Sequence, residues 1–230
     1  PVNPWNVLAI TFTNKAANEL RERLSAFGIQ GAESVWAMTF HSACVRILRR
    51  DIDRLGFSRD FTIYDTDDSK RVIKDILKEL NIDEKKLTPR EVLSAISNAK
   101  DAMESPQDYS RRWKGSGDWR KEAIAKIYTR YVHRLAEANA LDFDDIILHA
   151  VTLLQQEGEV RDYYRRKFRY VLIDEYQDTN QLQYQLTALL AGGYENICVV
   201  GDDDQSIYKF RGANIRNILD YEKVYPDAKV

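Results

Sequence analysis

The feature that most constrains the fold is the segment Arg169–Asp178, which reads RYVLIDEYQD. Its apolar residues 170–173 predict a strand buried on both faces, and that strand ends abruptly at Asp174 and Glu175. Open parallel α/β sheets bind ligands at the carboxyl ends of their strands. Two carboxylates at such an edge suit a hydrated Mg²⁺ and leave one group to orient or deprotonate a water. The alternative is a solvated acidic loop.

Composition narrows the class of protein. The 230 residues are 44% hydrophobic, which is enough for one large or two small globular domains. Neither a membrane-length apolar run nor a signal peptide is visible, so we expect a cytoplasmic protein. Cys44 and Cys198 stand in apolar segments and are predicted to be core residues, and three scattered histidines do not predict a zinc site.

The net charge of −2 does not by itself predict a nucleic-acid partner, but the charges are unevenly distributed. Eight Lys or Arg residues and two acids lie between Arg111 and Arg134, whereas seven acids and no Lys or Arg lie between Tyr170 and Asp204. The acidic region fits a cation site. We expect the basic run to be a solvated helix face, with DNA contact as the less favoured alternative.

Three more segments follow the pattern of an apolar strand that ends in polar residues. They are residues 7–12, 35–40 and 196–200, followed by polar residues at 11–15, 39–42 and 202–211. Right-handed crossovers make such strands parallel and bring their carboxyl ends to one edge. Polar side chains gathered there, with an amide at Gln205 and a following arginine, fit phosphoryl transfer.

The middle third is expected to be helical without a buried strand. Asp67 is predicted to begin one helix, Thr88 opens a capping box with proline next, and a long helix runs over about 118–140. Residues 141–145 are predicted to cap a return helix, and Thr179 a later one. We therefore predict an α/β sheet domain, residues 1–56 and 141–230, with an all-helical subdomain, residues 57–140, inserted into it.

Five segments, in this order, resemble successive motifs of the UvrD/Rep/PcrA helicases of superfamily 1. They are AITFTNKAA at 9–17, TFHS at 39–42, LDFDD at 141–145, IDEYQD at 173–178 and GDDDQSIYKFRGA at 201–213. The last two are the most specific, and the resemblance spans essentially the whole chain. It implies a RecA-like motor that uses ATP and Mg²⁺ to move 3′ to 5′ along single-stranded DNA and to unwind duplex at single-strand/duplex junctions.

The resemblance also implies a role for each matching residue. Asp174 would hold Mg²⁺, with Glu175 beside it, and Glu175 would activate the attacking water. Gln205 would sense the γ-phosphate and couple it to DNA. The residues that would support this coupling are Gln177, Asp178, Asp202 and Arg211. The residues that would contact DNA are Phe12, Thr13, Asn14, Thr39, His41, Ser42, Phe143, Tyr208 and Phe210, with the aromatic ones stacking on bases.

Other interpretations of these residues stay open. Phe12 and Phe143 could instead be buried core residues, because phenylalanine is usually found inside a protein. His41 could hydrogen-bond at a helix start instead of touching DNA. Tyr208 and Phe210, beside Lys209 and Arg211, are harder to bury. Base stacking is worth roughly 1–3 kcal/mol per aromatic residue and tolerates any sequence, as a motor on arbitrary DNA requires. Close relatives often have tryptophan at the position of Phe210, so stacking there is expected to be weaker.

One departure from the family pattern stands out, because G-x-x-x-x-G-K-[ST], the loop that cradles phosphates, is absent. The chain starts at Pro1 and stops at Val230 as if cut, so we expect a piece that lacks this loop and the second motor domain. Such a piece is predicted to be inactive alone. The alternatives for the intact protein are the helicase subunit of a helicase–nuclease complex, or a non-catalytic module that binds single-stranded DNA or a partner.

Overall fold

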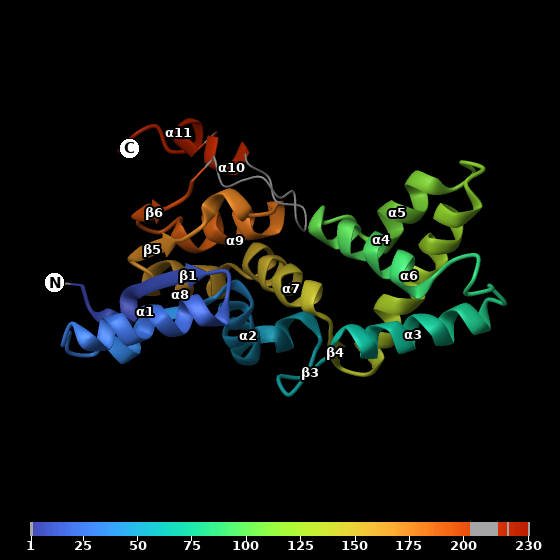
Figure 1. Ribbon diagram of the computed structural model, residues 1–230, viewed down its shortest axis with the longest axis horizontal. Coiled ribbons are helices and arrows are strands. Elements are labelled where there is room, and N and C mark those ends of the chain that lie inside the picture. Colours follow the sequence, from blue (N-terminus) through green and yellow to red (C-terminus); the bar gives the residue numbers. More distant parts are fainter. Residues whose placement is uncertain (1, 203–215, 220, 230) are drawn as a thin grey trace. The chain divides into compact units, whose positions relative to one another are not determined.

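The structure is a computed structural model that describes residues 2–202, 216–219 and 221–229 (Figure 1). Contacts divide the chain into a sheet unit, residues 1–51 with 150–230, and a helical unit, residues 52–149. The boundaries predicted from sequence were 56/57 and 140/141. Identifying the units as a motor domain and its inserted subdomain stays a prediction. Each unit is described by itself.

The sheet unit contains a four-stranded parallel sheet in the order β2-β1-β5-β6. Its strands are β1 (Val7–Thr11), β2 (Trp36–Thr39), β5 (Tyr170–Ile173) and β6 (Ile197–Val199). The central strand β1 pairs Thr11 with Thr39 on one side and Ile10 with Ile173 on the other. A parallel order with crossovers between non-consecutive strands confirms the predicted α/β class.

Helices flank this sheet (Figure 1). They are α1 (Asn14–Ala26), α2 (Phe40–Asp51), α8 (Gly158–Lys167), α9 (Gln181–Ala191), α10 (Arg216–Leu219) and α11 (Tyr221–Val224), while α7 (Phe143–Gln156) runs through the boundary between the units. Short 3-10 helices are η1 (Pro4–Asn6), η2 (Ala32–Ser34), η3 (Ile52–Leu55) and η4 (Tyr176–Asp178). As predicted, Thr13 caps α1, because its side chain accepts a hydrogen bond from the N–H of Ala16.

The predicted cap of α9 is wrong by one residue. Asn180, not Thr179, is the N-cap, and it exchanges reciprocal hydrogen bonds with Gln183. Thr179 is fully buried and donates its hydroxyl to the carbonyl of Tyr176 at 2.7 Å. Both residues are good caps by type, and only the path of the backbone decides between them.

The predicted burial of β5 and β6 is also wrong. In β5, Val171 and Ile173 are buried, whereas Tyr170 and Leu172 are 45% and 39% exposed. Cys198 in β6 is exposed, although Cys44 in α2 is buried as predicted. Four consecutive apolar residues carry no alternation, so their pattern cannot distinguish a strand covered on one face from a strand covered on both.

The helices of the helical unit pack around one apolar core of buried side chains. Its elements are β3 (Thr62–Ile63), α3 (Thr66–Glu79), α4 (Pro89–Asp101), α5 (Pro106–Trp113), α6 (Trp119–Glu137), β4 (Ala140–Leu141) and the start of α7. Thr88 caps α4 as predicted, but α3 is capped by Asp65 instead of Asp67. The expectation of no buried strand is wrong, since β4 is buried and pairs with β3.

The basic run on α5 and α6 is largely neutralised by neighbouring acids. Arg111, Arg112 and Arg120 form ion pairs with Asp108, Glu104 and Glu91. Arg130 and Arg134 both pair with Glu79. This pairing favours the interpretation as a solvated helix face. Within the described ranges, no helix is long and apolar enough to span a membrane.

Candidate functional site

The candidate site is the edge where the four parallel strands end. Thr11 is paired with Thr39, Ile10 with Ile173, and Ile173 with Val199, so the segments that follow β1, β2, β5 and β6 all leave from the same edge. The sequence-based expectation that these strand ends share one edge is confirmed. In such a sheet this edge is where ligands bind.

Asp174 and Glu175 emerge from β5, one of the two inner strands. The backbone N–H of Asp174 still bonds to the carbonyl of Ile10 at 3.1 Å, so the sheet fixes where its side chain begins. Glu175 then takes a left-handed conformation, φ 49° and ψ 44°, and donates its N–H to Asp174 Oδ1 at 2.9 Å. This conformation is uncommon for a residue other than glycine and is often found at functional sites. Both carboxylates are exposed.

The electrostatics of this turn affect Glu175 most. Partial burial, with the negative charges of Asp174 and Asp178, raises the pKa of Glu175 above its usual value. Burial and the two neighbouring negative charges each disfavour the ionised form of the Glu175 carboxyl. A carboxylate with a raised pKa is a better proton acceptor near neutral pH than an ordinary surface glutamate.

Gln177 joins the loops that follow β5 and β6. Its side chain is 3% exposed, and its Oε1 accepts a hydrogen bond from the backbone N–H of Asp202 at 3.1 Å. The N–H of Tyr176 also donates to the carbonyl of Val200 at 2.9 Å. Because a buried amide without a partner is costly, a displacement of one loop is resisted by the other.

The junction between β2 and α2 is held by its own side chains. Thr39 Oγ1 accepts from the N–H of Ser42 at 3.2 Å and donates to Ser42 Oγ at 3.0 Å. Thr39 is buried, His41 is half-buried and Ser42 is exposed at the first turn of α2. The structure thus brings this predicted group to the same sheet edge as Asp174.

The predicted DNA-contacting residues after β1 differ in exposure. Phe12 is half-buried and packs edge-to-face against Phe40, with ring centroids 5.4 Å apart. Thr13 is committed to capping α1, and Asn14 is exposed. Packing therefore accounts for part of Phe12, whose remaining surface stays accessible.

Phe143 lies in the helical unit, at the first residue of α7, and is 50% exposed, so the core-packing alternative is wrong for this residue. The remaining predicted site residues, Gln205, Tyr208, Phe210 and Arg211, lie outside the described residues.

The donor set at the edge fits a magnesium ion that arrives with a nucleotide. Among residues 2–202, 216–219 and 221–229, no group of three or more His, Cys, Asp or Glu could hold a metal ion. Mg²⁺ does not need such a cage, because it usually takes one or two protein carboxylates and completes its octahedron with phosphates and waters. Asp174 and Glu175 supply that number of carboxylates.

The chain matches the UvrD/REP helicase N-terminal domain family over residues 1–226. It is 51% identical over 229 residues to the ATP-dependent DNA helicase PcrA of Bacillus subtilis strain 168, covering 100% of this chain and 31% of the relative. It is 52% identical over 227 residues to PcrA of Staphylococcus aureus strain Mu50, and 50% identical over 228 residues to PcrA of Staphylococcus epidermidis. Both matches cover 99% of this chain and 31% of the relative. The chain belongs to the UvrD/REP helicase N-terminal domain family.

Proposed function

We propose that the chain is part of an ATP-driven DNA helicase that moves 3′ to 5′ on single-stranded DNA and unwinds duplex. The observation that carries the proposal is the pair Asp174 and Glu175 at the shared carboxyl edge of the parallel sheet. The names of the relatives, ATP-dependent DNA helicases, support the same activity.

In this proposal the two carboxylates have different roles. Magnesium bound with ATP neutralises charge on the phosphates. Asp174, anchored through its N–H to β1, holds the ion. Glu175 accepts a proton from the attacking water, a role that its raised pKa supports. Such proton transfer contributes typically 10²–10⁴-fold to a rate.

The coupling between ATP hydrolysis and movement on DNA would pass from β5 to the loop after β6. The bond from Asp202 to buried Gln177 supports a rigid connection between the carboxylates and that loop. Gln205 would sense the γ-phosphate, with Asp178, Asp202 and Arg211 in support. The roles of Gln205 and Arg211 rest on the resemblance.

Single-stranded DNA and single-strand/duplex junctions are the proposed partners. The proposed backbone contacts are Thr13, Asn14, Thr39, His41 and Ser42, and the proposed stacking residues are Phe12, Phe143, Tyr208 and Phe210. The exposure of Phe143 supports its share of this role. The chain spans 31% of the length of PcrA from B. subtilis, which supports a second motor domain as a further partner within a longer protein.

The test compares ATP hydrolysis by the 230-residue chain with hydrolysis by a two-domain form, which also carries a glycine-rich phosphate loop and a second motor domain. We expect negligible hydrolysis by the chain alone, because the loop that cradles the phosphates is not in its sequence. The two-domain form should hydrolyse ATP faster with oligo-dT and displace a strand from a duplex with a 3′ tail.

Two results would count against the proposal. Hydrolysis by the chain alone at the rate of the two-domain form would contradict its predicted inactivity. Binding of oligo-dT by the two-domain form without any hydrolysis would instead indicate a non-catalytic DNA-binding module.

A further inference from the structure

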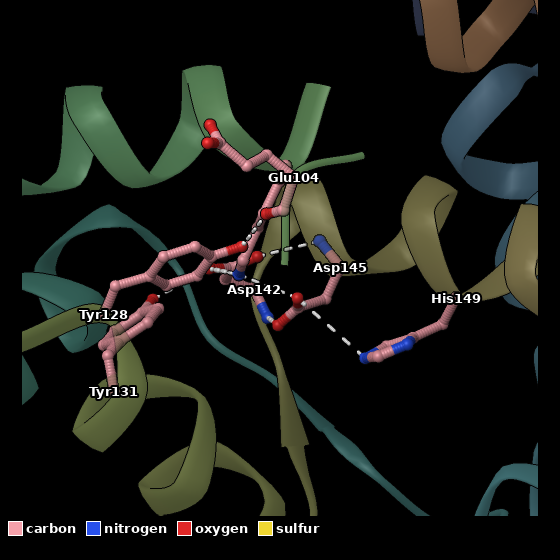
Figure 2. A network of polar contacts seen from close by, with 7 residues as sticks. Glu104, Tyr128, Tyr131, Asp142, Asp145 and His149 are labelled. Carbon is pink, nitrogen blue, oxygen red and sulfur yellow. Dashed lines mark hydrogen bonds and ion pairs between the residues drawn. The ribbon is translucent and has the colours of Figure 1, made fainter. Parts of the chain in front are cut away.

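A buried ion cluster lies at the start of α7 in the helical unit (Figure 2). Lys100 of α4 is 1% exposed, and its Nζ contacts Asp142 Oδ2 and Asp145 Oδ1, each at 2.7 Å. Tyr131 of α6 donates its hydroxyl to Asp142 Oδ2 at 2.8 Å. Three elements that are separate in sequence thus meet at the two carboxylates.

The two aspartates also cap the helix reciprocally. The N–H of Asp145 donates to Asp142 Oδ1 at 2.8 Å, and the N–H of Asp142 donates to Asp145 Oδ2 at 3.1 Å. All four carboxylate oxygens therefore accept a hydrogen bond or an ion pair. A buried polar network in which every member is satisfied holds one geometry, because any displacement leaves a charged group without a partner.

The charge state of the cluster follows from its contacts. Burial alone would lower the pKa of Lys100, but Asp145 and Asp142 outweigh it and raise that pKa. Burial opposes ionisation of Asp142, and the ammonium of Lys100 outweighs it and lowers the pKa. Burial raises the pKa of Asp145, and the ammonium of Lys100 offsets this only in part. When both carboxylates are ionised, the single ammonium leaves an excess negative charge at the helix N-terminus, where the helix dipole stabilises it.

A buried ion cluster of this kind is weak evidence for stabilisation of the fold. Replacing a buried ion pair by packed apolar residues is often neutral or stabilising, so a buried pair is better evidence for a fixed geometry than for stability. The residue whose geometry is fixed here is Phe143, which stands between Asp142 and Asp145 in sequence and is 50% exposed. Its backbone is held on both sides by aspartates that Lys100 clamps.

We propose that Lys100 is a positioning residue that fixes the start of α7 so that Phe143 presents its ring to a DNA base. The inference rests on the proposed function, specifically on the contact of Phe143 with single-stranded DNA. Lys100 touches no DNA in this account and acts only through Phe143.

A double-mutant cycle tests this dependence. Binding of a fluorescein-labelled oligo-dT to the full chain is measured by anisotropy at several salt concentrations for Phe143→Ala, Lys100→Met and the double variant. We expect Phe143→Ala to weaken binding roughly tenfold. Lys100→Met should weaken it by up to the same factor, and the double variant should bind no more weakly than Phe143→Ala. The salt dependence should be unchanged, because no phosphate contact is removed.

Controls separate positioning from loss of structure. Leu87→Ala removes a fully buried side chain from the core of the same unit and takes no hydrogen bond or ion pair away from the cluster, so it should leave DNA affinity unchanged while the variant is folded. If Lys100→Met does not fold, Tyr131→Phe removes only the hydroxyl that donates to Asp142 and should weaken binding about twofold to fivefold.

The outcomes are distinguishable. If Phe143→Ala weakens binding but neither Lys100→Met nor Tyr131→Phe does, or if the losses in the double variant multiply, the inference is overturned and the proposed function stands. If the chain binds oligo-dT but Phe143→Ala has no effect, the Phe143 contact and the inference both fail. If the chain does not bind oligo-dT at all, the proposed DNA-binding function fails with them.

Discussion

Two pairs of acids follow short strands in this molecule, and the structure uses them differently. Asp174 and Glu175 follow β5 and remain exposed. Asp142 and Asp145 follow β4 and are buried against Lys100. Among the described residues, no lysine or arginine forms an ion pair with the exposed pair, whereas the buried pair shares the ammonium of Lys100. The two pairs therefore differ in burial and in the presence of a lysine partner.

The largest expected effect concerns the exposed pair. In the two-domain form, Glu175→Gln keeps the shape of the side chain and removes its ability to accept a proton. We expect kcat for ATP hydrolysis to fall by about 10²–10⁴-fold with little change in stability. Steady-state kinetics measure this, with Glu33→Gln, an exposed acid elsewhere in the sheet unit, as the matched control. Equal activity in both variants would show that Glu175 is not the base.

The buried pair should respond in the opposite sense, with a loss of stability. Lys100→Met leaves two buried carboxylates without their cation, so the free energy of unfolding should fall by about 3–5 kcal/mol. Urea denaturation measures the change. Replacing Asp142 and Asp145 by Asn in the same variant should recover much of the loss. A Lys100→Met protein as stable as the parent would contradict the account of this cluster.

A third acid near the buried pair gives a pH dependence. Burial, with the charge of Asp144, raises the pKa of Asp101 to about 6. Between pH 4 and 6 the folded state therefore binds more protons than the unfolded state, so the stability that this group contributes below pH 4 is lost as pH rises through 6. Asp101→Asn should increase stability at pH 7 by about 1 kcal/mol, well below the full value of the shift because solvent screens a carboxyl that is only partly buried, and change it little at pH 4. Urea titrations at the two pH values would detect an absent or reversed difference.

The smallest expected effect compares two capping boxes. Asn180 and Gln183 make in α9 the same reciprocal bonds that Asp142 and Asp145 make in α7, but without charge and without a lysine. Asn180→Ala should therefore cost only about 1 kcal/mol, the usual value of a cap. Asp142→Ala should cost clearly more, because it also leaves Lys100 with a single partner. Similar unfolding free energies for the two variants would mean that the ion cluster adds nothing to the cap.

The sequence predicted the parallel sheet well because each strand of the sheet unit is a short apolar run that ends in polar residues. The exposure of Tyr170, Leu172 and Cys198 was not predictable, since it depends on what packs against each face. The ion pairs of Lys100 were not predictable for a similar reason. The acids at 142 and 145 were recognised as caps, but their lysine lies 42 residues before Asp142, and the only local sign is its position beside apolar residues of α4.

Among the site residues, Asp174, Glu175 and Thr39 could be placed at one edge from sequence, because parallel topology alone decides which strand ends meet. The left-handed turn at Glu175 and the bond from Asp202 to Gln177 could not, because they depend on backbone angles and on contacts between loops.

The most direct test of the central claim is metal binding at the exposed pair. Mn²⁺, which replaces Mg²⁺, is titrated into the two-domain form with a non-hydrolysable ATP analogue and followed by electron paramagnetic resonance. Because changes beyond the direct ligands already cost 10–100-fold in metal affinity, Asp174→Asn should weaken Mn²⁺ binding by about tenfold or more. Asp142→Asn, the matched change in the buried pair, should leave it unchanged. Equal Mn²⁺ affinity in the Asp174→Asn variant and the parent would contradict the claim that this strand end is the nucleotide centre.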